Sequence, residues 1–581
     1  MMDEANEMAE QEHFFHWELE FPEVYFDQFG RPLGNDGGFD AVVGNPPWER
    51  IKLQENEFFA GRDKAVALAP KASDRKRLIA ALAKEQPELW HDYEAARNRA
   101  DNFLSYTRDS GFYPLMGKGD TNYYALFAER ALQLVTTAGR VGLLVPSGIA
   151  TDDTTKGYFQ HLVSHRMLAE LLDFENREGM FPEVHRSFKF SIILLSGEGS
   201  PQESIRCGFF LHSVKEINDP ERISSLTQAD FRLFNPNTLT CPIFRRCRDA
   251  ELTRKIYKSA PVLINRALGD KGNPWNIRFS TMFHMTNDSK LFRTAAQLEA
   301  EGYWLGAGNV YTRGEEKYLP LYEGKMVQMY DHRAASIVVN PANVHRPAQE
   351  QPTTEDQHKD LAYSASPQFW VNMKSNDMPS WLLGFKDVTA PTNVRTVIPC
   401  VIPFSAVGNT FCLLNMPADV RHRTGAYLMA NLSSFALDFA ARQKVGGQHL
   451  NFFIVEQFPV LPPETYQRDW HGVILSDFIK ERVLELCYTA HDLKGFAEDM
   501  GYDGPPFKWD EERRLHLRCQ LDALYVHLYG LTRDEAGEIL DTFPIVKRQD
   551  EAKYGAYRTK DLILAYYNAY EAGNMAAWVK G

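Results

Sequence analysis

The sequence lacks any long hydrophobic run. No stretch approaches the roughly 18 to 20 uninterrupted apolar residues that a membrane-spanning helix requires. The acidic segment from Met1 to Glu12 has neither the basic nor the apolar part of a signal peptide. We therefore expect a cytoplasmic protein with no membrane contact. With 581 residues, the chain is too long for a single hydrophobic core and should divide into roughly three or four domains.

Cysteine is scarce. The seven cysteines are odd in number, scattered along 581 residues and too few for a disulfide framework. Cys241 and Cys247 form the only close pair, and no second pair of Cys or His follows at the spacing of a zinc finger. The sequence therefore predicts reduced thiols and no metal site.

The chain also lacks an excess of positive charge. Its net charge of −13 argues against an indiscriminate nucleic-acid binder, because non-specific affinity comes from Lys and Arg side chains that neutralise phosphates. A local exception lies between Trp381 and Leu461, where six basic residues accompany four acidic ones. This difference leaves room for a local basic cleft.

Residues 39–195 alternate short apolar runs with amphipathic stretches, a pattern typical of a mostly parallel α/β sheet. Apolar residues recur at steps of three and four between residues 122 and 137, which predicts a helix. Asp120 or Thr121 can cap this helix, and Gly139 can end it. Strands are predicted at residues 39–43, 140–146, 171–175 and 189–195.

The remaining segments have different patterns. Residues 49–119 are rich in charge and alanine and predict a helical insertion, either a solvated hairpin or a surface that faces DNA. Residues 206–463 are loop-rich and predict a mixed α+β region. From residue 464 onward the pattern is mainly helical, with helices expected at residues 473–493, 510–529 and 559–572. These changes give three predicted domains: residues 1–205, 206–463 and 464–581.

The motif Asn45-Pro46-Pro47-Trp48 follows the first predicted strand directly. An exocyclic amino group of a base is a poor nucleophile because its lone pair is delocalised into the ring. An Asn side-chain carbonyl and the rigid backbone carbonyl of a Pro can both accept hydrogen bonds from such an NH2 group and localise its lone pair. Asn45 and Pro46 fit these roles, and Trp48 offers a flat surface to a base taken out of the duplex.

The alternative interpretation of this motif is a Pro-Pro turn with an incidental Trp. The apolar strand before it favours a binding site, since open α/β sheets bind ligands at the carboxyl ends of their strands. The sequence therefore predicts that Asn45, Pro46 and Trp48 act together on an amino group.

The motif and its surroundings resemble the gamma-class N6-adenine DNA methyltransferases, in particular the large type IIG-like restriction-modification and related phage-defence methylases. Residues 119–127 and 139–147 look like the helix and strand that follow the catalytic loop in that family. Segments around Phe181 and Phe188 look like its late catalytic motif, which implies that Trp48, Phe181 and Phe188 stack on the target base. For either Phe taken singly, core packing is the alternative. The implied fold is the C-terminal part of a Rossmann-like methyltransferase sheet.

The resemblance extends toward both ends of the chain. Residues 14–23 are similar to the segment near the cofactor's adenine, which makes Phe15 and His16 candidate cofactor residues. Residues 319–333, 390–396 and 442–451 resemble parts of the family's target-recognition domain. Polar surface loops are the alternative there. The implied contacts to double-stranded DNA are Arg333, Arg395, Arg442, Lys444 and Gln448.

One expected motif is missing. The family binds S-adenosylmethionine at a Gly-rich turn of the type Phe-x-Gly-x-Gly that precedes the catalytic loop, and no such turn lies in the 44 residues before Asn45. The most similar Gly-x-Gly segment, Gly306-Ala307-Gly308, lies in the predicted recognition region. We expect either a separate chain that carries the cofactor-binding half or a truncated product of a longer gene. The isolated chain should then bind S-adenosylmethionine weakly or not at all.

Together these features predict an enzyme that transfers a methyl group from S-adenosylmethionine to adenine N6 in duplex DNA after base flipping, within a restriction-modification or phage-defence system. The alternative is a catalytically inactive DNA-recognition subunit or gene fragment of such a system. Cytosine N4 is chemically compatible with the same motif, and adenine is preferred by resemblance alone. No nuclease motif stands out in the sequence.

Overall fold

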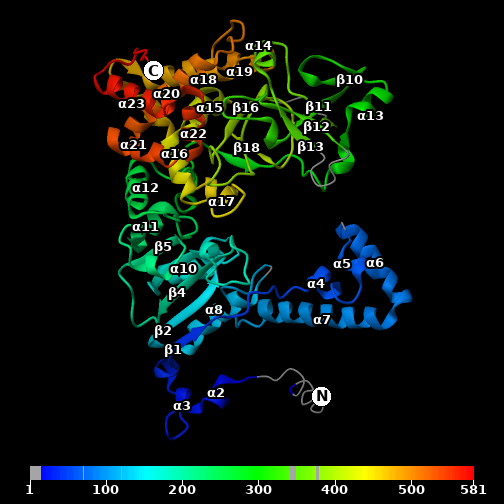
Figure 1. Ribbon diagram of the computed structural model, residues 1–581, viewed down its shortest axis with the longest axis vertical. Helices are drawn as coiled ribbons and strands as arrows, with labels where there is room; N and C mark the ends of the chain where they lie inside the picture. The colour runs from blue at the N-terminus through cyan, green and yellow to red at the C-terminus, as the bar shows by residue number, and fades with distance from the viewer. Residues whose placement is uncertain are drawn as a thin grey trace. The chain divides into compact units, whose positions relative to one another are not determined.

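The computed structural model describes residue 9 and residues 15–69, 71–119, 121–152, 154–340, 348–373 and 379–580. The chain divides into two compact units, Met1–Asp249 and Ala250–Gly581 (Figure 1). No helix in the described part of the chain is long and apolar enough to cross a membrane.

Unit 1 is built around a sheet with the strand order β1-β2-β4-β3-β5-β6. Pairing is parallel between β1 and β2 and between β3 and β5, whereas β4 runs antiparallel to both β2 and β3. The strands are β1 (Phe39–Gly44), β2 (Val135–Pro146), β3 (Leu168–Glu175), β4 (Lys189–Ser196), β5 (Ile205–Leu211) and β6 (Ile223–Leu226).

This topology confirms a mixed α/β fold but corrects the expectation of a mostly parallel sheet. Only residues 176–188 separate β3 from β4. This connection contains only the short 3-10 turn Asn176–Glu178 and no crossover helix, which favours antiparallel pairing, because parallel neighbours are usually joined through a helix.

The predicted helix before β2 is α8 (Tyr123–Leu134), whose side chains Tyr124, Ala128 and Ala131 are buried. The helix ends earlier than predicted, and β2 begins at once with Val135. The β-branched run Val135, Thr136 and Thr137 explains the difference, since such side chains favour strands over helices. The N-cap is Asn122, which makes no side-chain capping bond. Of the two predicted caps, Asp120 lies outside the described residues, and Thr121 directly precedes the observed N-cap Asn122.

The helical insertion forms an arm, defined here as residues 51–119. Its helices are α4 (Glu55–Phe59), α5 (Lys64–Ala67), α6 (Ala72–Glu85) and α7 (Pro87–Asp109). Phe59, Val66, Ile79, Leu82 and Tyr93 from these four helices form a small core of their own. Figure 1 shows α4, α5 and α6 gathered at one end of the long α7. The predicted insertion is therefore a folded element rather than an open loop.

The sheet of unit 1 continues beyond the predicted domain boundary at residue 205. The strands β5 and β6 complete it, and the helices α10 (Lys156–Ser164) and α11 (Gln228–Phe234) also belong to unit 1. Ile205–Leu211 is an almost wholly buried run, which explains its place inside the sheet. The first compact unit accordingly ends at Asp249, some 40 residues later than the sequence pattern placed the boundary.

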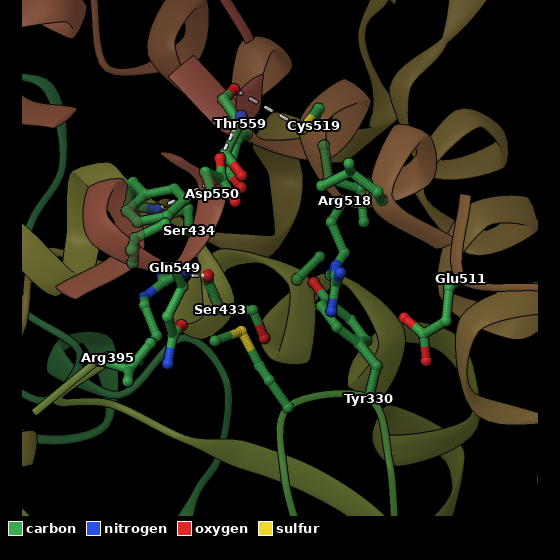
Figure 2. A pocket seen from close by; sticks show the side chains of 18 of the residues that line it. Tyr330, Arg395, Ser433, Ser434, Glu511, Arg518, Cys519, Gln549, Asp550 and Thr559 are labelled. Carbon is green, nitrogen blue, oxygen red and sulfur yellow. Dashed lines mark hydrogen bonds between the residues drawn. The ribbon is translucent and has the colours of Figure 1, made fainter. Parts of the chain in front are cut away.

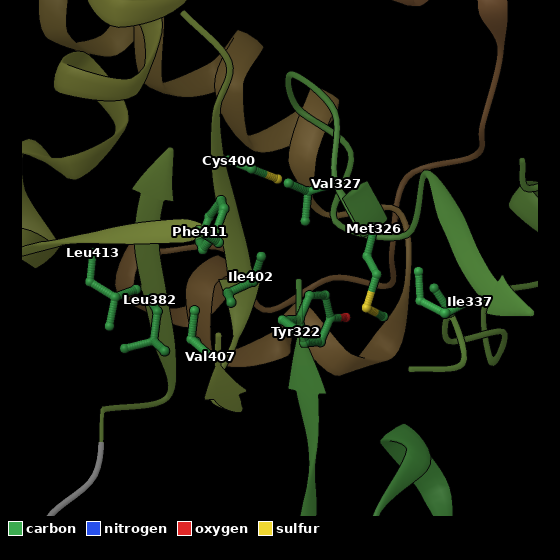
Figure 3. Packing of buried hydrophobic residues seen from close by; sticks show 11 residues of the cluster. Tyr322, Met326, Val327, Ile337, Leu382, Cys400, Ile402, Val407, Phe411 and Leu413 are labelled. Atoms are coloured by element: carbon green, nitrogen blue, oxygen red, sulfur yellow. The ribbon is translucent and has the colours of Figure 1, made fainter. Parts of the chain in front are cut away.

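The boundary falls within the helix α12 (Cys247–Ser259), and unit 2 continues from it into β structure. One of its sheets has the order β16-β15-β18-β7, and β11 pairs with β10 and β14 in another. Buried side chains of β11, β15, β16, β17 and β18 point toward one another and form the core of this part (Figure 3). The strands are β7 (Arg278–Ser280), β10 (Tyr311–Arg313), β11 (Glu316–Tyr322), β14 (Trp370–Asn372), β15 (Trp381–Lys386), β16 (Pro399–Pro403), β17 (Ala406–Val407) and β18 (Phe411–Asn415).

The C-terminal part of unit 2 is helical, as predicted. Its main helices are α15 (Ala418–Ser433), α16 (Phe435–Arg442), α18 (Leu475–Cys487), α20 (Glu511–Leu528), α21 (Arg533–Asp541), α22 (Pro544–Tyr554) and α23 (Arg558–Glu571). Local signals set their ends: Asp510 caps α20, and Thr532 and Glu535 form a capping box on α21. These helices and the β part belong to one compact unit, so the predicted boundary near residue 463 does not separate two units.

Candidate active site

The Asn45–Trp48 loop lies at the carboxyl end of β1, where Gly44 pairs with Leu143 of β2. Asn45 and Pro47 are exposed, Pro46 is buried and Trp48 is half-buried. The parallel pairing of β1 and β2 therefore fixes the start of the loop, while the Asn45 side chain remains accessible.

A cavity of about 330 Å³ lies against this loop. Besides Asn45, Pro46 and Trp48, its lining includes Phe181, Phe188 and Phe190. The Trp48 and Phe188 rings are nearly parallel, with centroids 5.8 Å apart and an interplanar angle of 14°, and Phe181 meets Phe190 edge to face. The structure thus brings together all the residues predicted for catalysis and base stacking.

Two of these aromatic side chains are more open than core packing would require. Phe181 is 38% exposed and Phe188 is 45% exposed. The indole Nε1 of Trp48 is buried and, within the described residues, has no hydrogen-bond partner. A buried donor without an acceptor is costly in a folded protein. We call this cavity the aromatic cavity, and its partly exposed Phe181 and Phe188 rings leave aromatic surface available to a ligand.

Asn176, which sequence reasoning missed, holds the wall of the aromatic cavity. It is 1% exposed and follows β3 directly. Its side-chain amide donates to the carbonyls of Phe181 and Val184 at 2.9 Å each, and its Oδ1 accepts from the Phe181 N–H at 3.0 Å. The Asn176 N–H also donates to the Phe188 carbonyl. The available signal was a short polar side chain immediately after a strand, a position that favours side-chain to backbone hydrogen bonds.

A second cavity of about 980 Å³ lies on another side of the loop and shares Asn45, Pro46 and Pro47 with the first. The predicted cofactor residues Phe15 and His16 line it. Much of the remaining wall is aromatic, and four of its aromatic side chains are about half exposed, namely Phe15, Tyr106, Phe112 and Phe127. The Asn45–Pro47 segment therefore separates two cavities, an arrangement suited to a reaction between two molecules.

The larger cavity is bounded by an open sheet edge. Among the described residues, β1 pairs with β2 on one side only. Val43 of this strand lines the cavity and is 86% exposed. Exposed strand edges are normally covered or shortened in folded proteins, since an open edge can pair with another chain.

Glu129 of α8 fixes one wall of the larger cavity. It is 2% exposed, and its carboxylate accepts hydrogen bonds from the Leu115 N–H at 3.0 Å and the Met116 N–H at 2.8 Å. Burial raises the pKa of Glu129 above its ordinary value, and the two backbone donors oppose this rise. These bonds tie the segment that leads out of the arm, including the lining residue Tyr113, to the helix beside the loop.

A buried polar cluster connects the inner strands at the same end of the sheet as the Asn45–Trp48 loop. Asp173 of β3 accepts hydrogen bonds from Ser147, which follows β2, and from Ser191 of β4 at 3.0 Å. Burial raises the pKa of Asp173, and both serine hydroxyls counteract this effect. The cluster connects the neighbouring strands β2, β4 and β3 and stabilises the end of the sheet from which the Asn45–Trp48 loop extends.

The DNA contacts predicted for Arg333 and Arg395 need correction. Arg333 is fully buried and donates four hydrogen bonds to the carbonyls of His358, Asp360, Tyr363 and Thr489. Arg395 is 9% exposed and pairs with the buried carboxylate of Asp438 while it lies over the Phe435 ring. Their donors serve the protein interior, so neither side chain can reach a phosphate or base from these positions.

Arg442 and Lys444 are also directed inward, and their predicted DNA contacts are corrected for the same reason. Arg442 donates to the carbonyls of Asn393, Val394 and Thr542. The Lys444 ammonium lies 4.8 Å from the centre of the Tyr257 ring, and burial lowers its pKa well below the usual range. Gln448 is exposed, and its contact with DNA stays a prediction.

Unit 2 contains a cavity of its own, of about 300 Å³ (Figure 2). Figure 2 shows Arg518 and Glu511 on one side of it and Arg395 and Gln549 on the other. Asp522 lines this cavity, is 7% exposed and accepts a hydrogen bond from the Phe435 N–H at 2.8 Å. Burial raises the pKa of Asp522 to about 6 despite the nearby Arg395. The sequence analysis predicted no site here.

Several solved structures are similar in part to the chain. The complex of the type IIL restriction-modification enzyme MmeI with DNA has a TM-score of 0.34 and 9% identity, over 88% of this chain and 57% of that chain. The DrdV–DNA complex has a TM-score of 0.34 and 9% identity, over 78% and 44%. The type IIG restriction endonuclease BpuSI has a TM-score of 0.26 and 12% identity, over 79% and 53%.

The chain therefore spans about half the length of each of these three structures. No curated protein matches the chain. The model of the Eco57I restriction-modification methylase family matches residues 2–76. This matched segment contains the Asn45–Trp48 loop, so the part of the chain that carries the candidate active site is similar in sequence to restriction-modification methylases.

Proposed function

We propose that unit 1 carries the catalytic site of a DNA methyltransferase that moves a methyl group from S-adenosylmethionine to adenine N6 in duplex DNA, within a restriction-modification or phage-defence system. The single observation that supports this function best is the position of Asn45 and Pro46 between two cavities. The match of residues 2–76 to restriction-modification methylases agrees with it.

The aromatic cavity would take the target base after it leaves the duplex. An adenine ring needs a stacking surface to replace its lost neighbours, and Trp48 and Phe188 provide nearly parallel rings. The Asn45 Oδ1 and the Pro46 carbonyl would accept hydrogen bonds from the adenine NH2 group. These bonds would direct the lone pair of the nitrogen toward the larger cavity without a strong base.

The larger cavity fits part of S-adenosylmethionine, which supplies the methyl group when bound. Its volume of about 980 Å³ is at the upper end of the range for small-molecule sites, and the aromatic side chain of Phe15 suits a purine ring. His16 and Glu18 line the same cavity and offer polar groups to a ribose. The segment before Asn45 has no Gly-rich turn for the methionine part, so this chain would hold the cofactor incompletely.

We further propose that an α/β element, from a separate chain or from a longer form of the same protein, completes the cofactor site by docking on the open edge of β1. A partner strand would pair with β1 and cover Val43, and a partner helix would cover half-exposed Phe127 of α8. Calorimetric titration of the isolated chain with S-adenosylmethionine should then show weak or no binding. Tight one-to-one binding by this chain alone would contradict the proposal of a split cofactor site.

The substitution Asn45→Ala tests the methyltransferase function. In cells that carry the whole natural system, single-molecule sequencing should show site-specific methylation with the wild-type chain and a loss of at least about 10²-fold in rate with the variant, as expected when a positioned hydrogen-bonding group is removed from a reaction centre. Asn56→Ala, an exposed substitution in α4, is the matched control and should leave methylation unchanged. Unchanged methylation with Asn45→Ala would show that the catalytic assignment is wrong.

The alternative is a DNA-recognition subunit without chemistry, and the missing Gly-rich turn is the observation that favours it. Under this alternative, Asn45→Ala would leave both DNA binding and any methylation by the system intact. The same pair of strains therefore separates the two functions.

A further inference from the structure

Residues 62–77 carry an unusual concentration of positive charge. Arg62, Lys64, Lys71, Arg75, Lys76 and Arg77 lie within this segment together with only two acidic residues, Asp63 and Asp74. The chain as a whole has a net charge of −13. We call the six basic residues of this segment the basic tip of the arm.

The basic tip is held in a folded element. The six basic residues lie in or next to α5 and the first half of α6, two helices that Figure 1 shows at one end of α7. The small core of Phe59, Val66, Ile79, Leu82 and Tyr93 packs these helices on the N-terminal part of α7. The charges are therefore displayed on a fixed surface rather than on a loose loop.

Most of the basic side chains at the tip are available to a ligand. Arg62, Lys64, Lys71, Lys76 and Arg77 are exposed. Within the described residues, Lys64, Lys71 and Lys76 form no ion pair, and Arg77 approaches Asp74 only at 3.9 Å. Three uncompensated cations in one small element repel one another, which favours a polyanionic partner.

The other end of the arm is rooted beside the candidate active site. The Ile51 N–H donates to the Thr121 carbonyl at 3.3 Å, and the Tyr123 N–H donates to the Glu49 carbonyl at 3.1 Å. Near the end of α7, the Phe103 ring packs on Tyr123 with centroids 5.8 Å apart. Both chain segments at the root are thus fixed to α8 next to the Asn45–Trp48 loop.

The length of α7 gives the approximate distance from the root of the arm to the basic tip. Its 23 residues rise by about 34 Å along the helix axis, which is about one turn of B-form DNA, or roughly 10 base pairs. We infer that the basic tip binds the phosphate backbone of the same DNA duplex about one helical turn from the target base. This inference rests on the proposed function, because it assumes that the aromatic cavity takes its base from that duplex.

Binding to the phosphate backbone predicts a specific salt dependence. Each phosphate contact contributes about 0.9 to the slope of log affinity against log salt concentration. The triple variant Lys64→Gln, Lys71→Gln, Lys76→Gln of the full-length chain should therefore lower the slope for a 30-base-pair duplex of arbitrary sequence by about 2 to 3. Fluorescence anisotropy across a series of NaCl concentrations measures this slope, and affinity at 0.1 M salt should fall by roughly 10²-fold.

Replacement of the same three residues by Arg is the matched control. The Arg variant keeps the charges and should keep the wild-type slope and affinity. Circular dichroism should show the same unfolding temperature for both variants, and if the triple Gln variant unfolds, the single Lys71→Gln variant should still lower the slope by about 1. A wild-type slope in the Gln variants would overturn the inference and point to an acidic protein as the partner of the tip.

The outcome is separable from the test of the methyltransferase function. Asn45→Ala should abolish methylation without any change in the salt slope, because Asn45 contacts no phosphate in the proposed arrangement. A lowered slope in the tip variant of a system that never methylates would refute the enzyme function but retain the DNA contact of the arm.

Discussion

The Asn45–Trp48 region of unit 1 and the Arg333–Arg395 region of unit 2 both gather polar and aromatic side chains, yet they differ in how these groups are used. In unit 1, Asn45 is exposed and the buried Trp48 Nε1 has no partner among the described residues. In unit 2, Arg333 makes four hydrogen bonds to backbone carbonyls through its two terminal nitrogens, which leaves its buried Nε without a partner among the described residues, and Arg395 is paired with Asp438.

This difference separates binding groups from structural groups. A polar side chain whose donors and acceptors are already used stabilises the fold, and its removal leaves buried partners unpaired. A side chain with unused capacity beside a cavity can serve a ligand. Residue type alone, such as Arg or Lys in a polar segment, does not distinguish the two cases.

The largest expected effect concerns stability in unit 2. Arg395→Ala leaves the fully buried Asp438 carboxylate with only the more distant Arg442, at 3.6 Å, as a cation and should lower the free energy of unfolding by about 3 kcal/mol. Urea denaturation of the full chain measures this loss. If the variant keeps the wild-type free energy of unfolding but binds DNA more weakly, Arg395 is a DNA contact and not a structural residue.

Asn176 provides the next test, because it is a structural residue next to the site. Asn176→Ala removes three hydrogen bonds of the loop that carries Phe181 and Val184, at about 1 kcal/mol each. We expect a drop in methylation rate of about 10-fold or more from misplacement of the aromatic wall. Single-turnover kinetics with the complete system measures this rate.

The control for Asn176 is again Asn56→Ala, whose side chain is exposed on α4. A loss of stability at Asn176 with an unchanged methylation rate would mean that the aromatic wall plays no part in the reaction.

Asp522 tests whether a buried carboxylate of unit 2 is fully stabilised by its neighbours. Its folded pKa of about 6 lies above the value of about 3.9 in an unfolded chain. The unfolded state therefore loses its proton first as the pH rises, and stability should fall between about pH 4 and pH 6 and stay level above pH 6. Two pKa units correspond to at most about 3 kcal/mol.

Asp522→Asn should remove this pH dependence while its side-chain oxygen can still accept the Phe435 N–H bond. The variant should gain thermal stability over the wild type at pH 7 and none at pH 4, as measured by unfolding temperature. An equal difference at both pH values would show that Asp522 does not titrate in this range.

The smallest effect is expected at the stacking surface of unit 1. Trp48→Ala should reduce methylation by about 10 to 10²-fold, which corresponds to about 1 to 3 kcal/mol of lost base stacking. Trp48→Phe should retain most of the rate because it keeps an aromatic face. Equal rates for the Ala and Phe variants would exclude stacking by Trp48.

The sequence predicted the parts of the fold that local pattern controls. The strands around Phe39–Gly44 and Lys189–Ser196 and the long C-terminal helices lie close to their predicted bounds. The direction of β4 and the inclusion of β5 and β6 in the sheet were missed, because strand pairing depends on partners distant in sequence.

The candidate site was predictable for a different reason. Asn45, Pro46 and Trp48 are adjacent in the chain, so a strand before them was enough to place them at a sheet edge. The inward direction of Arg333 and Arg395 depends on carbonyls and carboxylates up to 156 residues away, such as Thr489. No spacing rule within a single segment could have indicated those contacts.

The most direct test of the account is the nucleoside composition of DNA from cells that carry the complete natural system, with and without the gene for this chain. Mass spectrometry should detect N6-methyladenine only when the gene is present. The appearance of N4-methylcytosine instead would keep the amino-group chemistry of the Asn45–Trp48 loop but change its base. An identical composition in both strains, with neither modified base, would contradict the central claim that unit 1 holds a methyltransferase site.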